Sequence, residues 1–273
     1  MTTPPLPPSL TERDLAGIFE VFASASDEPN VFVMLTDEEL LGLGGQAAVE
    51  LTGTPYLDAA EVDRTAVANT ALRSLIARGL IVLDPEHQEN EGEDLDEGSA
   101  ANRPFQLERR LAGILAIRQA PSAMLTVNRQ VADQTTSIYY YISVNDGILE
   151  EFVGADGYHH FSVPTRDCIP ERLARYVDQN EVAGDADGDC IDTTMEELDG
   201  SGELAERFRD ARALSVLTTI SSAEATQHSV LALSDAVFLM EGPEEGLGSV
   251  TVQECSRASL LEAFAELLPA VED

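Results

Sequence analysis

Hydrophobic and polar residues alternate along a stretch in the middle of the chain. One set of alternate positions holds Ile138, Tyr140, Ile142 and Val144, and the set between them holds Ser137, Tyr139, Tyr141 and Ser143. A period of two residues is typical of a strand with one buried face and one more polar face. The segments 145–147 and 154–157 contain Asn, Asp and Gly, which tolerate the positive φ of tight turns. We therefore expect a four-stranded β-meander between Ala123 and Val163, with a polar loop at 130–136.

Apolar residues recur every three to four positions before and after this stretch, which predicts helices. Ser9 and Glu12 form a capping-box pattern, and Thr36 and Glu39 form a second one. The first helix carries an apolar stripe that we expect to face the core, made of Leu15, Ile18, Phe19 and Phe22. The other expected helices follow Thr36 and span 63–78, 105–119 and 169–177, and a short strand is expected at 31–35.

Two segments are rich in Asp and Glu and contain few apolar residues, 84–102 and 181–202. Such segments bury too little apolar surface to offset the entropy lost on ordering. We expect the first to be a mobile acidic loop and the second to be an acidic linker.

The order of elements is repeated after the second acidic segment. A helix carrying Leu204 and Phe208 is expected first, followed by strands at 215–220, 229–233, 236–241 and 249–255, and a closing helix with Leu260 and Phe264. The predicted fold class is α/β (α+β), with two pseudo-repeated helix–β-meander–helix halves, an antiparallel sheet and flanking helices. The expected organisation is an N-terminal helical segment (1–83), an acidic loop (84–102), a first helix–meander–helix unit (103–180), an acidic linker (181–202) and a second unit (203–273).

The charge of the chain excludes some partners. The 273 residues include 50 Asp and Glu but only 16 basic residues, giving a net charge of −34. A nucleic-acid surface needs clustered cations, and an anionic membrane would also repel this chain. The N-terminus lacks the basic and apolar regions of a secretory signal, and no apolar run reaches the roughly 18 residues of a membrane span. We expect a cytoplasmic protein with a protein partner, and we expect Cys168, Cys190 and Cys255 to be free thiols.

The segment from Asp185 to Glu196 partly matches a calcium loop. The residues at positions 1, 3, 5 and 12 of such a loop are Asp185, Asp187, Asp189 and Glu196. Position 6, where the turn needs Gly, is Cys190. We therefore favour a solvated linker, with a weak cation site as the alternative, and expect no metal.

The sequence contains no recognisable catalytic motif. His159 and His160 are adjacent in an expected strand and should point to opposite faces, so they cannot share a metal without a bulge. His160, Asp167 and Cys168 could be brought together by folding, but they match no nucleophile or metal signature. No glycine-rich phosphate loop is present. We expect no enzyme and no cofactor.

Tyr139 and Tyr141 lie on the more polar face of the central strand. Exposed aromatic side chains are enriched in interfaces, so these rings are candidates for partner binding. The loop beside them adds three candidates, Gln130, Asp133 and Gln134. The alternative is that a helix or the second meander covers both rings.

The order of these elements resembles the EspG family, the cytosolic chaperones of type VII (ESX) secretion and their actinobacterial relatives. The segments that carry the resemblance are LTDEELLGL, ALRSLIARGLI, RRLAGILAI and SLLEAFAELL, and the similarity covers most of the chain. It implies a chaperone that holds apolar helical secretion substrates before export. Two alternatives remain: a regulator with a winged-helix-like segment at 63–83, for which Arg64, Arg73 and Arg78 are available, and a hydrolase with a dispersed site.

Overall fold

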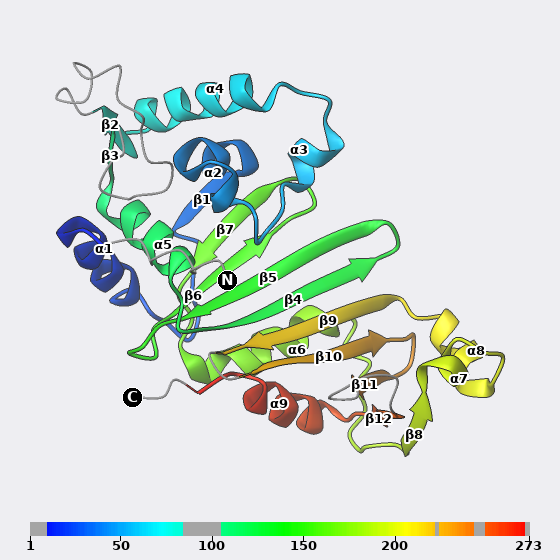
Figure 1. The fold of residues 1–273 in the computed structure, drawn as a ribbon. Helices are drawn as coiled ribbons and strands as arrows, with labels where there is room; N and C mark the ends of the chain where they lie inside the picture. The colour runs from blue at the N-terminus through cyan, green and yellow to red at the C-terminus, as the bar shows by residue number, and fades with distance from the viewer. Residues whose placement is uncertain (1–9, 84–104, 222–223, 243–248, 271–273) are drawn as a thin grey trace, which may run out of the picture. The chain divides into compact units, whose positions relative to one another are not determined.

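The computed structural model describes residues 10–83, 105–221, 224–242 and 249–270, so the expected acidic loop at 84–102 lies outside the described residues. The fold is α+β with antiparallel sheets, as the alternating and helical patterns predicted. The chain divides into two units (Figure 1). Unit 1 contains residues 1–121 and 153–163, and unit 2 contains residues 122–152 and 164–273. This division differs from the predicted one, because 103–121 and 153–163 belong with the N-terminal part.

Unit 1 contains most of the helices of the first half. Its elements are α1 (Glu12–Phe22), β1 (Val33–Thr36), α2 (Asp37–Gly44), the 3-10 helix η1 (Gln46–Ala48), α3 (Pro55–Ala59), α4 (Arg64–Ala77), β2 (Ile81–Leu83), β3 (Phe105–Leu107), α5 (Arg109–Gln119) and β7 (Tyr158–Ser162). β1 pairs antiparallel with β7, and β2 pairs with β3. The helix expected at 105–119 begins later, at Arg109, because Phe105–Leu107 form β3, which pairs with β2.

The first helix buries a different face from the one that we expected. Its buried residues are Asp14, Gly17 and Val21, whereas Leu15 is exposed and Phe19 is 70% exposed. A Cβ atom placed on Gly17 would lie 2.6 Å from the backbone nitrogen of Gly113 in α5. The two helices therefore cross with their backbones in contact, and this close approach determines which face of α1 is inward.

Unit 2 contains one long run of antiparallel strands. Its elements are β4 (Ala123–Val131), β5 (Gln134–Ile142), β6 (Ile148–Val153, all but its last residue), the 3-10 helix η4 (Arg166–Cys168), α6 (Ile169–Val177), β8 (Cys190–Thr194), α7 (Met195–Leu198), α8 (Glu203–Arg209), β9 (Ala213–Ile220), β10 (Ala225–Ala232), β11 (Val237–Glu241), β12 (Ser249–Glu254) and α9 (Arg257–Glu266). The strand order is β6-β5-β4-β9-β10-β11-β12-β8. The expected polar loop at 130–136 is instead part of the β4–β5 hairpin, whose turn is Ala132-Asp133, with φ of 52° at Ala132.

The two halves share one more feature than the sequence predicted. β1 is followed by α2, whose N-terminus has a capping box formed by Thr36 and Glu39. β8 is followed by α7, whose N-terminus has the same capping box formed by Thr194 and Glu197. Each of these strands pairs with the last strand of its own meander, β1 with β7 and β8 with β12. The pseudo-repeat therefore includes a strand and a helix before each helix–meander–helix set, and the expected acidic linker at 181–202 contains one of these pairs.

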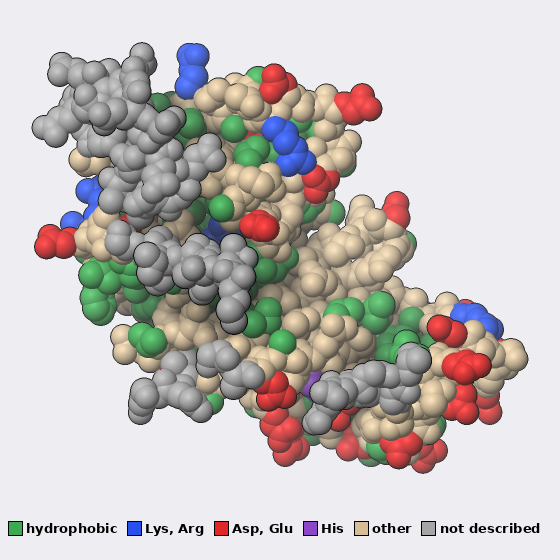
Figure 2. All heavy atoms as spheres, viewed as in Figure 1, with side chains coloured by type: hydrophobic (Ala, Val, Ile, Leu, Met, Phe, Trp, Pro, Cys, Tyr) green, Lys and Arg blue, Asp and Glu red, His purple; other side chains and the backbone are tan. Residues whose placement is uncertain are grey.

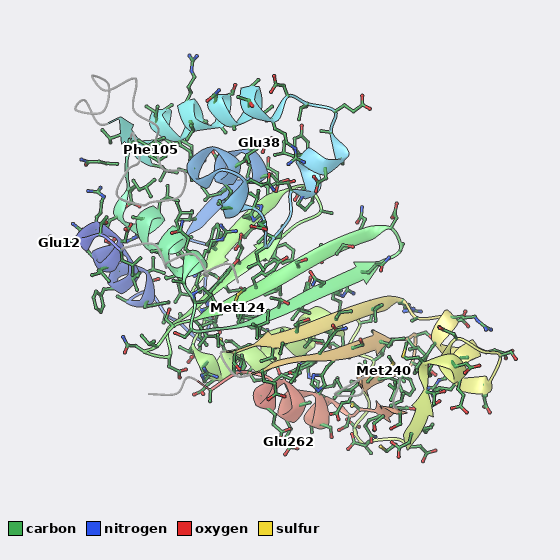
Figure 3. The ribbon with its side chains drawn as sticks, in the orientation of Figure 1. Glu12, Glu38, Phe105, Met124, Met240 and Glu262 are labelled. Carbon is green, nitrogen blue, oxygen red and sulfur yellow. The ribbon has the colours of Figure 1, made fainter. Side chains whose placement is uncertain are left out.

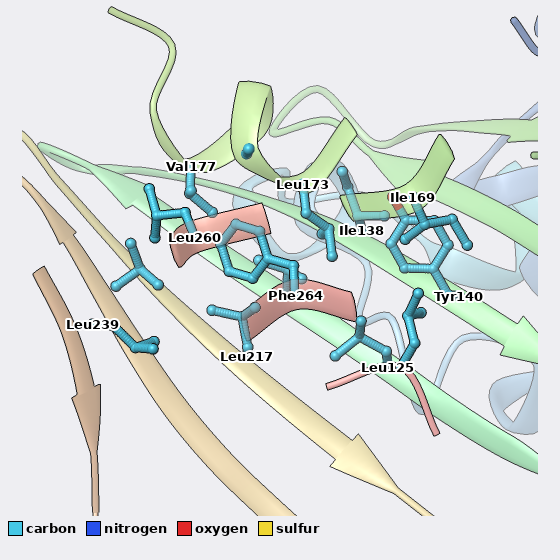
Figure 4. Packing of buried hydrophobic residues seen from close by; sticks show 14 of the residues in the cluster. Leu125, Ile138, Tyr140, Ile169, Leu173, Val177, Leu217, Leu239, Leu260 and Phe264 are labelled. Atoms are coloured by element: carbon cyan, nitrogen blue, oxygen red, sulfur yellow. The ribbon is translucent and has the colours of Figure 1, made fainter. Parts of the chain in front are cut away.

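The main core of unit 2 lies on one face of its sheet, beneath α6 and α9. Figure 4 shows this packing, with Leu173, Val177, Leu260 and Phe264 from the helices and Leu125, Ile138, Tyr140, Leu217 and Leu239 from the strands. These side chains occupy alternate positions of β4, β5, β9 and β11, as the period-two pattern requires. A smaller cluster on the other face joins β10, β11 and β12 to Leu198, Leu204 and Phe208, from α7 and α8.

Candidate binding surface

The structure places the two candidate tyrosines inside the protein. Tyr139 is 5% exposed and Tyr141 is 0% exposed, so the expectation of rings on a half-wet surface is wrong. The Tyr141 hydroxyl donates a hydrogen bond to Oε2 of the buried Glu151 at 2.5 Å, and the two rings stack with centroids 6.3 Å apart. The alternation correctly predicted a strand, but both of its faces are covered at these positions.

The same face of the sheet is open farther along, on β4, β9 and β10. The strand register brings together alternate residues of these three strands. We call this surface the neutral face; it consists of Asn128, Gln130, Leu214, Val216, Thr218, Ile220, Gln227 and Ser229. Leu214 is 37% exposed and Ile220 is 39% exposed, and the other members are exposed or half-buried.

None of these residues is charged, although charged residues make up 24% of the chain. Charged residues are also absent from the buried positions of this face on the four central strands, β5, β4, β9 and β10. The position of β9 is labelled in Figure 1, and Figure 2 shows hydrophobic and other uncharged side chains over this strand in the same view. The Asp and Glu side chains visible on this side of unit 2 lie elsewhere. A surface without charge on a chain of net charge −34 is suited to an apolar partner.

Buried residues border the neutral face along the strands and across them. Figure 3 labels Met124 on β4 and Met240 on β11. Met124 is buried at one end of the face, and Met240 packs against the cluster under α7 and α8. The two ends of the neutral face on β9 are Leu214 and Ile220.

The three polar candidates beside the tyrosines separate in the structure. Gln130 belongs to the neutral face, directly opposite Leu214. Its side-chain amide donates a hydrogen bond to the carbonyl of Ala132 at 3.2 Å. Asp133 and Gln134 are exposed at the tip of the β4–β5 hairpin. Of the five residues predicted for partner binding, three are exposed, and Gln130 is the one that belongs to the neutral face.

The four acidic candidates do not form a calcium loop. Asp187 instead accepts hydrogen bonds at the start of α9, from the Ser256 N–H at 2.7 Å and the Ser259 hydroxyl at 2.8 Å. These hydrogen bonds, above all that from the Ser256 N–H, lower the pKa of Asp187. The remaining members, Asp185, Asp189 and Glu196, lie in the preceding turn, just before β8 and in α7. Among the described residues, no group of three or more His, Cys, Asp or Glu could hold a metal ion.

A buried histidine–aspartate pair in unit 1 was not found from the sequence. His159 Nε2 lies 2.9 Å from Asp37 Oδ1, and both side chains are fully buried. The other carboxylate oxygen of Asp37 accepts hydrogen bonds from the backbone N–H groups of Tyr56 and Leu57. The pair thus ties β7 and α2 to the start of α3, which is a structural role. His160 lies in unit 1, whereas Asp167 and Cys168 lie in unit 2.

Two of the three arginines named for a winged-helix-like regulator form ion pairs with acidic residues. Arg64 pairs with Asp58 at 2.5 Å, and Arg78 pairs with Glu39 at 2.6 Å. A recognition helix needs cations directed at phosphates and bases. Neither arginine is available in that way.

No model of a known protein family matches the chain, and no curated protein matches it. In the described part of the chain, no helix combines the length and apolar character that crossing a membrane requires.

Proposed function

We propose that this chain is a non-enzymatic binding protein whose neutral face holds the apolar side of a helix from a partner protein. The observation that carries the proposal is the partly exposed, charge-free surface of β4, β9 and β10 in a strongly acidic chain. Burial of apolar area there would stabilise a complex, whereas a charged partner surface would lose its hydration without gaining an ion pair.

The topology favours a helix over a strand as the bound element. β4, β9 and β10 each have a hydrogen-bonded neighbour on both sides, so no free backbone edge is available for strand addition. A partner must therefore pack on the side chains of the sheet face, as helices do. The distance along β9 from Leu214 to Ile220 is about 20 Å at roughly 3.3 Å per residue. A helix of about 13 residues has that length.

The resemblance to EspG gives this activity a biological setting. An EspG-like chaperone would keep apolar helical substrates of type VII secretion from aggregating in the cytoplasm. The order of strands and helices supports this setting. We therefore propose a cytoplasmic secretion chaperone.

A charge placed on the neutral face tests the proposal. The probe is a synthetic helical peptide with Leu at i, i+3, i+4 and i+7 and uncharged residues elsewhere, carrying a neutral fluorophore. We expect Val216→Glu to weaken its binding at least tenfold, about 1.4 kcal/mol, because the new carboxylate would be buried without a partner. Fluorescence anisotropy gives the dissociation constants.

The matched control is Val144→Glu, the same change at a residue that is 66% exposed near the β5–β6 turn. This variant should bind the peptide within twofold of the unmodified protein. Equal binding by both variants would show that the neutral face is not the binding surface. Failure of the unmodified protein to bind the peptide would also contradict the proposal.

A further inference from the structure

Three polar side chains form a row on the helix-covered face of the unit 2 sheet. Thr136, Arg129 and Ser215 are direct register partners across β5, β4 and β9. The residues two positions along on the same strands are Ile138, Val127 and Leu217, all members of the apolar core. The row therefore places polar groups at the border of a core that is otherwise apolar.

Arg129 has no hydrogen-bond acceptor among the described residues. Its Nε atom is buried and unpaired, although the chain has a large excess of carboxylates. Other half-buried arginines on this side of the sheet do have acidic partners: Arg172 pairs with Glu150, and Arg257 with Glu171. Burial lowers the pKa of Arg129, and the electrostatic effect of Tyr176 offsets part of this shift.

Ser215 lies directly opposite Arg129 and is 1% exposed. Its Oγ has no hydrogen-bond partner in the described part of the chain. Directly opposed side chains have Cβ atoms about 5 Å apart. One oxygen-bearing group can therefore accept hydrogen bonds from both the guanidinium and the hydroxyl.

Tyr176 of α6 fixes the position of the guanidinium. Its ring centroid lies 5.9 Å from Cζ of Arg129, and its hydroxyl lies 2.7 Å from Thr136 Oγ1. Burial raises the pKa of Tyr176 to about 12, so the hydroxyl stays neutral and does not compete as an anion. The next residues on this face are Val131 and Gln134, both exposed, so the row lies two residues from the exposed hairpin tip.

We propose that Arg129 and Ser215 bind the carboxylate group of a small monocarboxylic acid. A planar guanidinium matches a carboxylate in shape and can donate two parallel hydrogen bonds to it. The site offers one cation in a protein of strongly negative charge, which favours a singly charged anion over a phosphate dianion. This site is on the face opposite the neutral face and does not depend on the proposed function.

Acetate is the probe, and the Nε–Hε NMR signal of Arg129 is the readout. The signal is assigned by its loss in Arg129→Gln. We expect a saturable shift with sodium acetate and none with sodium chloride at equal ionic strength. Inorganic phosphate should bind at least fivefold more weakly than acetate. The Nε–Hε signal of the exposed Arg73 is the internal control and should not move.

Ser215→Ala separates a ligand site from a structural hydroxyl. Removing a buried hydroxyl that has no partner should leave the unfolding transition unchanged or raise its midpoint, while the affinity for acetate falls at least fivefold. Identical, unsaturated shifts in acetate and chloride would overturn the proposal, because they indicate a general effect of salt and not a bound carboxylate. So would unchanged acetate affinity in Ser215→Ala, or a loss of stability in that variant.

Discussion

The loss of Asp37 should strongly destabilise unit 1. It accepts hydrogen bonds from two backbone N–H groups and contacts the buried ring of His159. We expect Asp37→Ala to lower the free energy of unfolding by about 3 to 5 kcal/mol, because two backbone N–H groups and the His159 ring lose the buried carboxylate that they share. Urea denaturation measures the change.

The control is Asp235→Ala, which removes an exposed carboxylate paired with Arg207. Exposed pairs contribute about 1 kcal/mol or less, so this variant should be nearly as stable as the unmodified protein. Equal losses in the two variants would mean that the Asp37–His159 pair has no special role.

Asp187 should contribute stability that depends on pH. Its pKa is lowered from the ordinary value of 3.8, so its stabilising effect is complete above about pH 4 and is lost as pH falls through the folded-state value. The difference in urea midpoint between the unmodified protein and Asp187→Ala should therefore be larger at pH 7 than at pH 3. Asp185→Ala, which removes the aspartate two residues earlier, is the control. A difference that does not change with pH would contradict a stabilising role for the hydrogen bonds that Asp187 accepts from Ser256 and Ser259 at the start of α9.

At the scale of single residues, local sequence patterns predicted where a helix begins, but they did not predict which side chains are buried. The Thr36–Glu39 pattern identified the start of α2 from four residues, because a capping box is a local interaction. The same pattern at Thr194 and Glu197 was missed, because the surrounding acidic residues suggested a linker. The burial of Tyr139 and Tyr141 was the alternative to exposed rings, and the sequence did not decide between the two because burial depends on segments remote in sequence.

The crossing of α1 and α5 depends on two glycines. A Cβ on Gly17 would lie 2.2 Å from the Arg109 carbonyl oxygen, and one on Gly113 would lie 2.3 Å from the backbone of Gly17. We expect either Gly→Ala change to lower the free energy of unfolding by about 1 to 3 kcal/mol, as overpacking does. This would occur despite the better helix propensity of alanine, about 1 kcal/mol. Thermal or urea unfolding gives the values.

Gly202→Ala is the matched control, because no atom lies within 4 Å of its added Cβ. It should change stability by no more than about 0.5 kcal/mol. If Gly17→Ala were as stable as this control, the backbone contact between the two helices would be refuted.

At the scale of elements, the periodicity of apolar residues predicted whether a segment is a helix or a strand better than it predicted which face of that element is buried. The stripe containing Leu15 and Phe19 is the larger apolar surface of α1, so a sequence argument based on area selects it. The structure instead buries Gly17, because close backbone approach excludes side chains from the contact. Alternation likewise predicted the strands of both meanders but could not identify which part of a face would be open.

At the scale of the whole molecule, the order of elements is repeated, and charge is distributed unevenly over the surface. The net charge of −34 was evident from composition, but the charge-free face appears only when β4 and β9 are brought side by side. These strands are about 90 residues apart in sequence, so the register between them is a long-range property. Most helices and the strands of both meanders were predictable from the sequence, whereas the position of the neutral face was not.

Site-specific photo-crosslinking in the native host tests the binding surface most directly. A photoreactive residue is placed at position 216 on the neutral face or at position 144 as the control, and crosslinked peptides are identified by mass spectrometry. We predict crosslinks from position 216 to the apolar side of a helix in a partner protein, and none to that helix from position 144. Crosslinks to the same partner from both positions, or from neither, would contradict the assignment of the neutral face as the binding surface.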